Sequence, residues 1–569
     1  MNNDNRNFVT FIVIAALIFF GSQWVTHYFF PPANPPVTKI VGGKTTVQPN
    51  ATAPSPTTPA KTRDLKAVLT DSAAQRVAID TPTLKGSINL KGARIDDLVL
   101  TAYKETIAKN SPPIRLLSPD GASDAYFAEF GWQNNGGLQA PSADTFWAAN
   151  SRVLAPGKPV TLTAANTQGQ VFAIELSVDD QYMFTIRQTV VNKSGAPINV
   201  ASAALISRAS APKDPDTWSI QVGPMSVHDG KADYGVNYSD VDKGAKQFTT
   251  TGGWLGFTDK YWLTALVPDR GAAFAGQFTS PGPKTYSADY ARAATPLAPG
   301  KALTQTSHFF AGAKEVRLID HYTDSGLVPM LDYSIDWGWF RVIEKPIFYY
   351  LDWLFRMIGN FGVAIMFLTL TIRALIFPIA QRQFASMAAM RAIQPKMKAL
   401  QERHKDDKQR QQQEIMALYK AEKVNPLAGC LPTFLQIPIM YSLYKVLMLT
   451  IEMRHQPFVG WIHDLSAPDP AMILNLFGYL HFTPSGFLAI GVVPVLLGVS
   501  MWLQFRMNPA PMDAAQKQVF AFMPWVLMFV MAPFAVGLQV YWITSNLLTV
   551  LQQKILYARH PALKQAVAK

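Results

Sequence analysis

An arginine lies inside an apolar run that is long enough to cross a lipid bilayer. The run FGVAIMFLTLTIRALIFPI (Phe361 to Ile379) contains Arg373 and no acidic residue that could neutralise the guanidinium. A charge at the centre of a membrane-spanning helix costs about 2.5 to 3.5 kcal/mol on insertion scales, so such residues usually have a function. Snorkelling to the nearer boundary is the alternative, because only about six residues, roughly 9 Å, separate Arg373 from it.

Composition and charge fit a membrane protein with a large soluble part. Of the 569 residues, 49% are hydrophobic and 16% are charged, and the formal net charge is +12. The excess of Lys and Arg lies beside the apolar segments near the C-terminus, as expected of cytoplasmic loops, so DNA is not an expected partner. Cys430 is the only cysteine, which excludes an internal disulfide and a thiolate metal cluster. We expect no metal and no cofactor.

The N-terminal segment predicts a membrane anchor followed by a linker. The apolar run from Phe8 to Phe30 has roughly the 20 residues that span the hydrocarbon core. A cleaved signal peptide would have a shorter apolar core and a small-x-small cleavage site, so we expect residues 1–30 to be an uncleaved transmembrane signal anchor. Residues 31–64 are rich in Pro, Thr and Ala and predict an unfolded linker.

Alternating apolar residues predict an all-β sandwich domain over residues 65–335. The clearest example is Phe172, Ile174, Leu176 and Val178, which is followed by a turn at Asp179-Asp180 and a second alternating run. The domain lacks a catalytic constellation: its histidines are scattered, and it has no Gly-rich phosphate loop and no HExxH motif. We therefore expect a binding or spacing module and no enzyme. The histidines are His228, His308 and His321.

The remaining sequence predicts a polytopic α-helical membrane protein. An amphipathic helix at 340–358 fits the membrane interface, although packing on the β domain fits its pattern nearly as well. Together with the anchor, five further apolar segments predict six transmembrane helices. The expected segments are transmembrane helices at 359–380, 428–450, 486–505, 519–532 and 534–556, a cytoplasmic helical hairpin at 381–426, a periplasmic loop at 451–485, a cytoplasmic loop at 506–518 and a basic cytoplasmic tail at 557–569.

The distribution of Lys and Arg predicts the orientation. Residues 381–424 contain ten Lys or Arg against five acids, whereas Glu452 to Ser485 contains Arg454 alone. By the positive-inside rule the hairpin and the tail are cytoplasmic, and the loop is on the outer side. Six crossings then place both termini in the cytoplasm and the β domain outside.

Further polar residues accompany Arg373 in the predicted spans. Tyr541, Ser545 and Thr549 follow at i, i+4 and i+8 and share one helix face. Such residues can also be interhelical contacts, worth about 0.6 kcal/mol each. No Asp or Glu lies within the last five spans, so the Arg373 cation requires a hydrated cavity or a transient anionic guest. The polar set is Thr369, Thr371, Gln436, Ser442, Ser500, Gln504, Gln539, Tyr541, Ser545, Asn546 and Thr549.

The predicted cytoplasmic hairpin contains an apolar stripe of methionines. The two helices reverse near His404 to Asp407, and the first is bent or interrupted at Pro395. Flexible methionines suit varied partners, but at helical spacing they are also typical of the seam of a hairpin. The methionines are Met387, Met390, Met397 and Met416.

Several long runs resemble the YidC family of membrane protein insertases. They are MALYKAEKVNPLAGCLPTFLQIPIMYSLYKVL, FVGWIHDLSAPDP, FMPWVLMFVMAPFAVGLQVYWITSNLLTVLQQ and TIRALIFPIAQRQFASMAAMRAIQPK. The run GGWLGFTDKYWLTALVP resembles the large periplasmic domain of the Gram-negative branch. The sequence differs from the family pattern in its linker and in its second outer loop, Leu474 to Phe487, which looks longer.

The resemblance implies a five-helix core with a hydrophilic groove that opens to the cytoplasm and the lipid. It assigns Arg373 as the groove arginine, Gln504 and Trp542 as groove-lining residues and Tyr541 as a substrate contact, and it implies a required hairpin. It also implies an energy-independent insertase and chaperone of the bacterial inner membrane, with nascent membrane proteins, the Sec translocon, the ribosome and membrane lipids as partners. A solute channel or transporter and a non-catalytic assembly scaffold are the alternatives.

Overall fold

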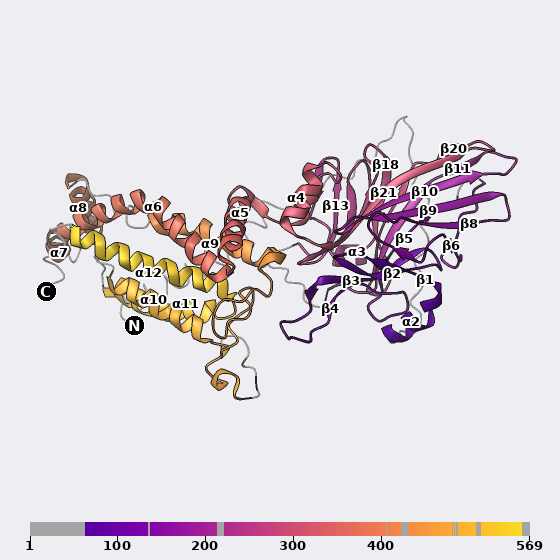
Figure 1. The fold of residues 1–569 in the computed structure, drawn as a ribbon. Coiled ribbons are helices and arrows are strands. Elements are labelled where there is room, and N and C mark those ends of the chain that lie inside the picture. The colour runs from indigo at the N-terminus through magenta and orange to yellow at the C-terminus, as the bar shows by residue number, and fades with distance from the viewer. Residues whose placement is uncertain are drawn as a thin grey trace, which may run out of the picture. The chain divides into compact units, whose positions relative to one another are not determined.

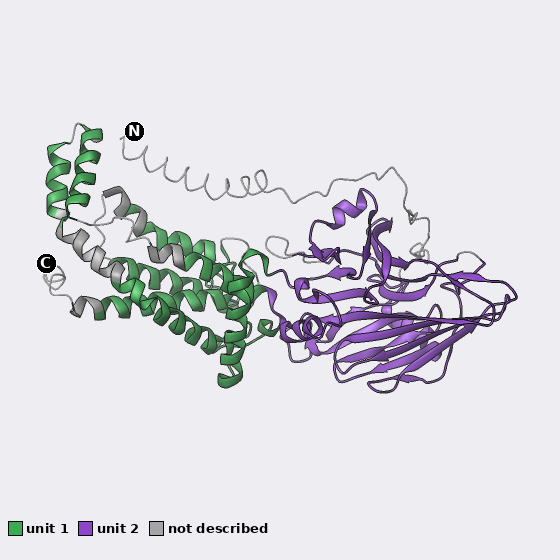
Figure 2. Cartoon of the chain, turned by 90° about the horizontal axis from the view of Figure 1, so that it is seen from above, with its two compact units in different colours: residues 1–31, 337–448, 452–569 green, residues 32–336, 449–451 purple. Residues whose placement is uncertain are grey.

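The computed structural model describes residues 63–134, 137–212, 221–404, 407–422, 431–480, 482, 484, 488–507 and 514–559. The chain divides into two compact units, residues 32–336 with 449–451, and residues 1–31, 337–448 and 452–569 (Figure 2). We call their described parts the β unit and the helical unit. The predicted anchor (1–30), nearly all of the linker (31–62) and most of the tail (560–569) lie outside the described residues.

The β unit contains two large, mainly antiparallel sheets and one short two-stranded sheet (Figure 1). The ten-stranded sheet has the order β15-β18-β19-β12-β5-β3-β2-β1-β7, with β4 paired to β3 and a parallel pairing between β1 and β7. Its strands are β1 (Arg76–Asp80), β2 (Leu84–Asn89), β3 (Arg94–Lys104), β4 (Pro113–Leu117), β5 (Tyr126–Trp132), β7 (Val153–Leu154), β12 (Ser202–Arg208), β15 (Lys246–Thr251), β18 (Ala273–Gly282) and β19 (Thr285–Arg292).

The second large sheet has nine strands in the order β14-β13-β16-β17-β21-β10-β9-β8-β6. Its strands are β6 (Ala148–Ala149), β8 (Val160–Ala165), β9 (Gln170–Val178), β10 (Met183–Asn192), β13 (Gly223–His228), β14 (Lys231–Asp233), β16 (Trp254–Thr258), β17 (Trp262–Pro268) and β21 (Ala302–Ala313). The short sheet pairs β11 (Ile198–Val200) with β20 (Thr295–Leu297), and the helices of the unit are α2 (Leu65–Asp71), α3 (Tyr238–Asp242) and α4 (Val316–Asp324).

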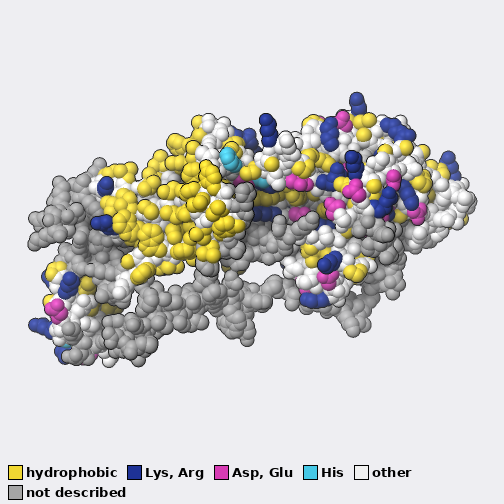
Figure 3. Space-filling model, turned by 90° about the horizontal axis from the view of Figure 1, so that it is seen from below, with side chains coloured by type: hydrophobic (Ala, Val, Ile, Leu, Met, Phe, Trp, Pro, Cys, Tyr) yellow, Lys and Arg dark blue, Asp and Glu magenta, His cyan; other side chains and the backbone are white. Residues whose placement is uncertain are grey.

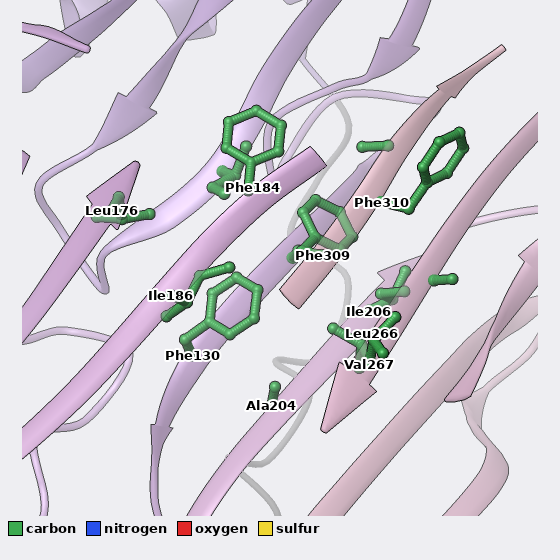
Figure 4. Close-up of a cluster of buried hydrophobic side chains, with 14 of the residues drawn as sticks. Phe130, Leu176, Phe184, Ile186, Ala204, Ile206, Leu266, Val267, Phe309 and Phe310 are labelled. Atoms are coloured by element: carbon green, nitrogen blue, oxygen red, sulfur yellow. The ribbon is translucent and has the colours of Figure 1, made fainter. Parts of the chain in front are cut away.

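The predicted alternation is present in the hairpin of β9 and β10. Every second residue of β9 is buried, and the Asp179 carboxylate accepts the backbone N–H groups of Gln181 and Met183, which closes the turn. Buried side chains of both sheets meet in one hydrophobic core (Figure 4). Phe130 of one sheet meets Phe309 of the other edge to face, with ring centroids 5.8 Å apart. The prediction of a β sandwich is confirmed.

The helical unit follows the β unit in sequence. Its helices are α5 (Arg341–Ile358), α6 (Phe361–Ala392), α7 (Gln394–Arg403), α8 (Lys408–Ala421), α9 (Leu431–Leu449), α10 (Val492–Met507), α11 (Ala514–Met531) and α12 (Val536–Arg559). Two of the helices are longer than the membrane spans expected at 359–380 and 519–532. α6 continues into the expected hairpin region as far as Ala392, and α11 begins at Ala514. The change from apolar to polar residues at Gln381 therefore does not end α6.

One helix among the described residues is long and apolar enough to cross a membrane by itself. It covers Phe361–Gln381 with a mean hydropathy of 2.2. Two shorter apolar helices are found at Val492–Met507 and Ala521–Met531. Figure 3 shows hydrophobic side chains gathered over one face of the helical unit, and Leu375 of α6 is 75% exposed. The structure thus gives a β domain followed by apolar helices, and the count of six spans remains a prediction.

A buried carboxyl group in the β unit predicts that the free energy of unfolding depends on pH. Asp289 of β19 is buried with Gln277 and Ser287 as its hydrogen-bond partners, and burial raises its pKa to about 6. Ionisation is therefore harder in the folded state, so the free energy of unfolding falls as pH rises from about 4 through 6. Asp289→Asn should stabilise the β unit relative to wild type by up to about 3 kcal/mol at pH 8, and by little at pH 4.

Urea unfolding of the full chain, followed by tryptophan fluorescence at both pH values, measures this difference. Asp180→Asn, at an exposed turn, is the control and should show no such pH dependence. A constant difference between Asp289→Asn and wild type across the pH range would contradict the assignment.

Candidate functional site

Arg373 lies on the inward side of α6. A buried stripe on this helix contains Phe361, Ala364, Ile365, Leu368 and Thr369, and Arg373 continues it one turn after Thr369. Apolar side chains are exposed on the opposite side of the helix, at Met366, Phe367, Leu370 and Leu375. The guanidinium is therefore directed away from the apolar surface of the unit, and snorkelling along that surface does not describe it.

The guanidinium of Arg373 is held by α12. Its Nε and Nη2 both donate to the Ser545 hydroxyl, at 3.2 and 2.5 Å. Ser545 is buried, and Arg373 is half-buried. Among the described residues, no carboxylate forms an ion pair with Arg373. A neutral hydroxyl satisfies only part of a cation with five N–H donors, so the site retains capacity for an anionic acceptor.

The neighbours of Ser545 on α12 bind two other helices. The Gln436 side-chain amide of α9 donates to the Tyr541 hydroxyl at 2.5 Å, and the Asn546 amide donates to the Ser500 hydroxyl of α10 at 2.9 Å. Tyr541, Ser545 and Asn546 are each at least 97% buried. Three polar residues within two turns of α12 thus connect α9, α6 and α10. We call Arg373, Gln436, Ser500, Tyr541, Ser545 and Asn546 the polar cluster.

The other predicted groove residues have different surroundings. Thr369 is buried, but its hydroxyl donates to the Ile365 carbonyl of its own helix at 2.7 Å. Gln504 of α10 and Trp542 of α12 are half-buried, and no hydrogen bond between either side chain and the polar cluster is recorded in the described part of the chain. Their predicted contact with a guest therefore remains a prediction.

The hairpin methionines have two kinds of environment. Met397 of α7 accepts a hydrogen bond from the Tyr419 hydroxyl of α8 through its sulfur, at 3.3 Å. Met416 of α8 is 59% exposed. The side chains of Met387 and Met390, on the C-terminal part of α6, lie outside those that the structure describes. Met397 thus belongs to the seam between α7 and α8, whereas the side chain of Met416 is exposed.

The loop after α9 binds the N-terminal ends of other helices. The carbonyls of Leu465 and Ala467 accept the backbone N–H groups of Gly537 and Val536 at the start of α12, both at 2.9 Å. The Asn360 side chain, just before α6, donates to the Phe458 carbonyl at 2.9 Å. These bonds satisfy helix-terminal groups that have no partner within their own helix.

The buried carboxylate of Asp469, in the same loop, binds the first turn of α10. Its Oδ1 accepts the Trp461 indole N–H and the Ala471 backbone N–H, both at 3.0 Å. Its Oδ2 accepts the Val493 backbone N–H in the first turn of α10 at 2.7 Å, where a negative charge is favourable. The loop therefore joins α6, α10 and α12 at the end of the bundle on which it lies.

Sequence reasoning missed three buried charged residues. Glu344 and Asp352 of α5 are 0% and 5% exposed, whereas Val342 and Met357 of the same helix are largely exposed. Lys445, inside α9, is 3% exposed. The spacing of Glu344 with Phe348 and Asp352 at i, i+4 and i+8 was a signal that the acids share the buried face.

Comparisons with known proteins cover nearly the whole chain. Residues 76–350 match the family described as YidC periplasmic domain, and residues 353–564 match the family described as 60Kd inner membrane protein. A relative from Zymomonas mobilis named membrane protein insertase YidC is 46% identical over 565 residues, covering 98% of this chain and 96% of the relative. The chain belongs to the YidC family of membrane protein insertases.

Two further proteins named YidC are similar to this chain. A YidC protein of Beijerinckia indica is 47% identical and covers 86% of this chain and 83% of its own length. A solved structure described as an active YidC insertase with the first transmembrane domain resolved is 16% identical, with a TM-score of 0.35, and covers 84% of this chain and 92% of that chain. YidC is thus the family that the sequence motifs indicated, an inner-membrane family with a periplasmic domain.

The Asp469 junction in this YidC-family chain can be tested by a graded pair of variants. Trp461→Phe removes one donor to Asp469 and should cost about 1 kcal/mol. Asp469→Ala leaves two buried backbone N–H groups and the Trp461 indole N–H without their acceptor, and should lower the midpoint of thermal unfolding in detergent several times more. Equal effects of the two variants would show that the carboxylate is not the shared acceptor.

Proposed function

We propose that this chain is a membrane protein insertase and chaperone that transfers membrane proteins into the lipid bilayer through a hydrated groove at the polar cluster. The single observation that supports this most directly is the position of Arg373. It lies on the inward face of α6, the one described helix that is long and apolar enough to cross a membrane. It is bound by one neutral hydroxyl and has no ion pair among the described residues. The family membership and the names of the relatives support the same activity.

The proposed topology has six transmembrane helices, five of them in the core, with both termini in the cytoplasm. Its support is the charge asymmetry: residues 381–424 contain ten Lys or Arg, whereas 452–485 contain only Arg454. Because the loop 452–491 is then on the periplasmic side, the junctions of Asp469, Leu465 and Ala467 close the outer end of the bundle. The groove opens toward the cytoplasm.

This geometry allows electrostatic recruitment of the membrane protein that is being inserted, which we call the guest. An acidic residue in the short outer segment of a guest, 4 Å from the Arg373 guanidinium, gains about 4 kcal/mol at an effective dielectric constant near 20, before desolvation. The net gain is smaller because both groups lose water, so the pair recruits the segment without trapping it. A hydrated inner half also shortens the apolar distance that the segment must cross.

The driving force for release is the guest's own hydrophobicity. Partition of an apolar helix of about 20 residues into lipid is favourable by itself, so the step requires neither nucleotide nor metal. The side chains of α6 that are exposed beside the polar cluster, such as Leu370 and Leu375, give the guest an apolar surface along which to leave.

The proposed partners follow from the same picture. Nascent membrane proteins and membrane lipids contact the groove, and the Sec translocon is a second partner for longer guests. The hairpin of α7 and α8, with exposed Met416, and the basic tail are the candidate contacts for a ribosome.

Substitution of Arg373 should separate guests by charge. Arg373→Ala should lower insertion of a guest with an acidic outer tail about tenfold more than insertion of the same guest with a neutral tail, if about 1.4 kcal/mol of attraction survives desolvation. Arg373→Lys keeps the cation and should retain most of this preference. Insertion into proteoliposomes, scored by protection of the tail from protease, is the measurement.

Three outcomes would oppose the proposal in different ways. Equal impairment of acidic and neutral guests would remove the role of charge attraction. Flux of a small solute that depends on Arg373, with insertion unaffected, would favour a channel or transporter. A scaffold role would be favoured if variants that lack the polar cluster still insert the guest fully and insertion is lost only when the β unit is removed.

A further inference from the structure

The second half of the loop before α10 has no charged residue. From Pro470 to Phe505 the sequence contains no Asp, Glu, Lys or Arg, whereas Glu452 to Asp469 contains Glu452, Arg454, Asp464 and Asp469. Of this uncharged stretch only 492–505 belongs to the helix α10. We call the described residues of 472–488 the apolar loop.

The apolar loop directs large hydrophobic side chains outward. Tyr479 is 83% exposed, and seven other large apolar residues of the loop are 41–58% exposed. A patch of this kind is rare on a surface that meets only water. These seven residues are Ile473, Leu474, Leu476, Phe477, Leu480, Phe482 and Leu488.

The backbone of the apolar loop is hydrogen-bonded within the loop. The N–H groups of Phe477 and Leu480 donate to the carbonyls of Met472 and Asn475, at 2.8 and 3.0 Å. Ile473 N–H donates to the Ile490 carbonyl at 2.9 Å, which ties the two ends of the loop together. These hydrogen bonds satisfy part of the loop's backbone while its apolar side chains face outward, as contact with the membrane interface requires.

The backbone conformation at the tip of the apolar loop is unfavourable for its residue types. Leu476 and Phe477, in a short 3-10 turn, have φ values of 51° and 60°. A left-handed conformation costs roughly 1–2 kcal/mol for such a residue. Since both side chains are more than half exposed, contacts within the chain do not account for this cost.

We infer that the apolar loop inserts into the interfacial layer of the outer leaflet, with the phospholipid bilayer as its partner. The loop is continuous with α10, whose exposed side chains Leu496, Val499 and Trp502 extend the apolar surface. Asp469 fixes the base of the loop to the first turn of α10. Tyr is enriched at membrane interfaces, and Phe and Leu are typical of the apolar face of segments that lie in the interface. The inference rests on the proposed placement of the helical unit in a membrane, and it does not require insertase activity.

The consequence is a second anchor for α10 on the outer side. The loop holds the start of α10 at a fixed depth, beside the lipid into which a guest helix would move. This role also explains why the loop carries aromatic and aliphatic residues in place of charges.

Depth-dependent quenching on the full chain tests the inference. In a Cys430→Ala background, Tyr479→Cys carries an environment-sensitive fluorophore, and the protein is reconstituted into phosphatidylcholine vesicles. We expect a blue shift of the emission, loss of fluorescence with lipids that carry a nitroxide near the headgroup, and little loss with aqueous iodide. Leu476→Cys is the second position, and Ala108→Cys, exposed in the β unit, should show the opposite quenching.

Each other outcome has a defined meaning. Iodide quenching at 479 and 476 equal to that at 108 overturns the inference. Protection from both iodide and nitroxide lipid also overturns it, because a protein surface then covers the loop. A fluorophore at Leu375→Cys should be quenched by a nitroxide deep in the acyl chains; if it is not, the membrane placement itself fails, whereas failure at the loop alone leaves the proposed function intact.

Discussion

The hydrogen bonds between the Arg373 guanidinium and the Ser545 hydroxyl join α6 to α12 and are the interaction on which the proposed function depends. They place a cation inside a helix that is otherwise apolar over Phe361–Gln381, on the face that meets α12. A neutral acceptor does not neutralise the charge, so hydration or an anionic guest must supply the remaining stabilisation. The polar cluster then gives α12 a central role, because it binds α9 and α10 through residues adjacent to Ser545.

One loop ties several helices together at one end of the bundle. At the end that includes Asp469, one loop accepts the N–H groups of α10 and α12 and the side chain of Asn360. The polar cluster lies further along the helices, where side-chain hydrogen bonds join α12 to α6, α9 and α10. In the proposed function, the guest enters the bundle from the side that the Asp469 loop does not tie.

Much of the architecture could be predicted from the sequence because its periodicities are strong. The alternation in Phe172 to Val178 predicted the β domain, and the i, i+4, i+8 spacing of Tyr541, Ser545 and Thr549 predicted a shared face, of which Tyr541 and Ser545 contact α9 and α6. The direction of Arg373 was left open, since the apolar run has nearly uniform hydrophobicity around the helix and no face stands out. Only the packing of α6 shows which residues are buried.

Other features depended on tertiary contacts that local patterns do not encode. The extension of α6 to Ala392 has no composition signal, because the helix passes from apolar to charged residues without a break. Asp469 appeared as an ordinary loop residue, although its carboxylate joins three N–H donors that are separated by up to 32 positions in sequence. The burial of Lys445 was likewise unexpected, because charged residues near helix ends are usually placed at the surface.

The most direct test of the central claim is the water accessibility of the polar cluster. Thr549 lies one turn from Ser545 on the same face of α12 and is half-buried, so Thr549→Cys in a Cys430→Ala background is a small change. A membrane-impermeant thiol reagent should label this position from the cytoplasmic side of inverted vesicles and not from the outer side, while Leu375→Cys stays unlabelled. Absence of labelling from both sides would show a dry site and contradict the account.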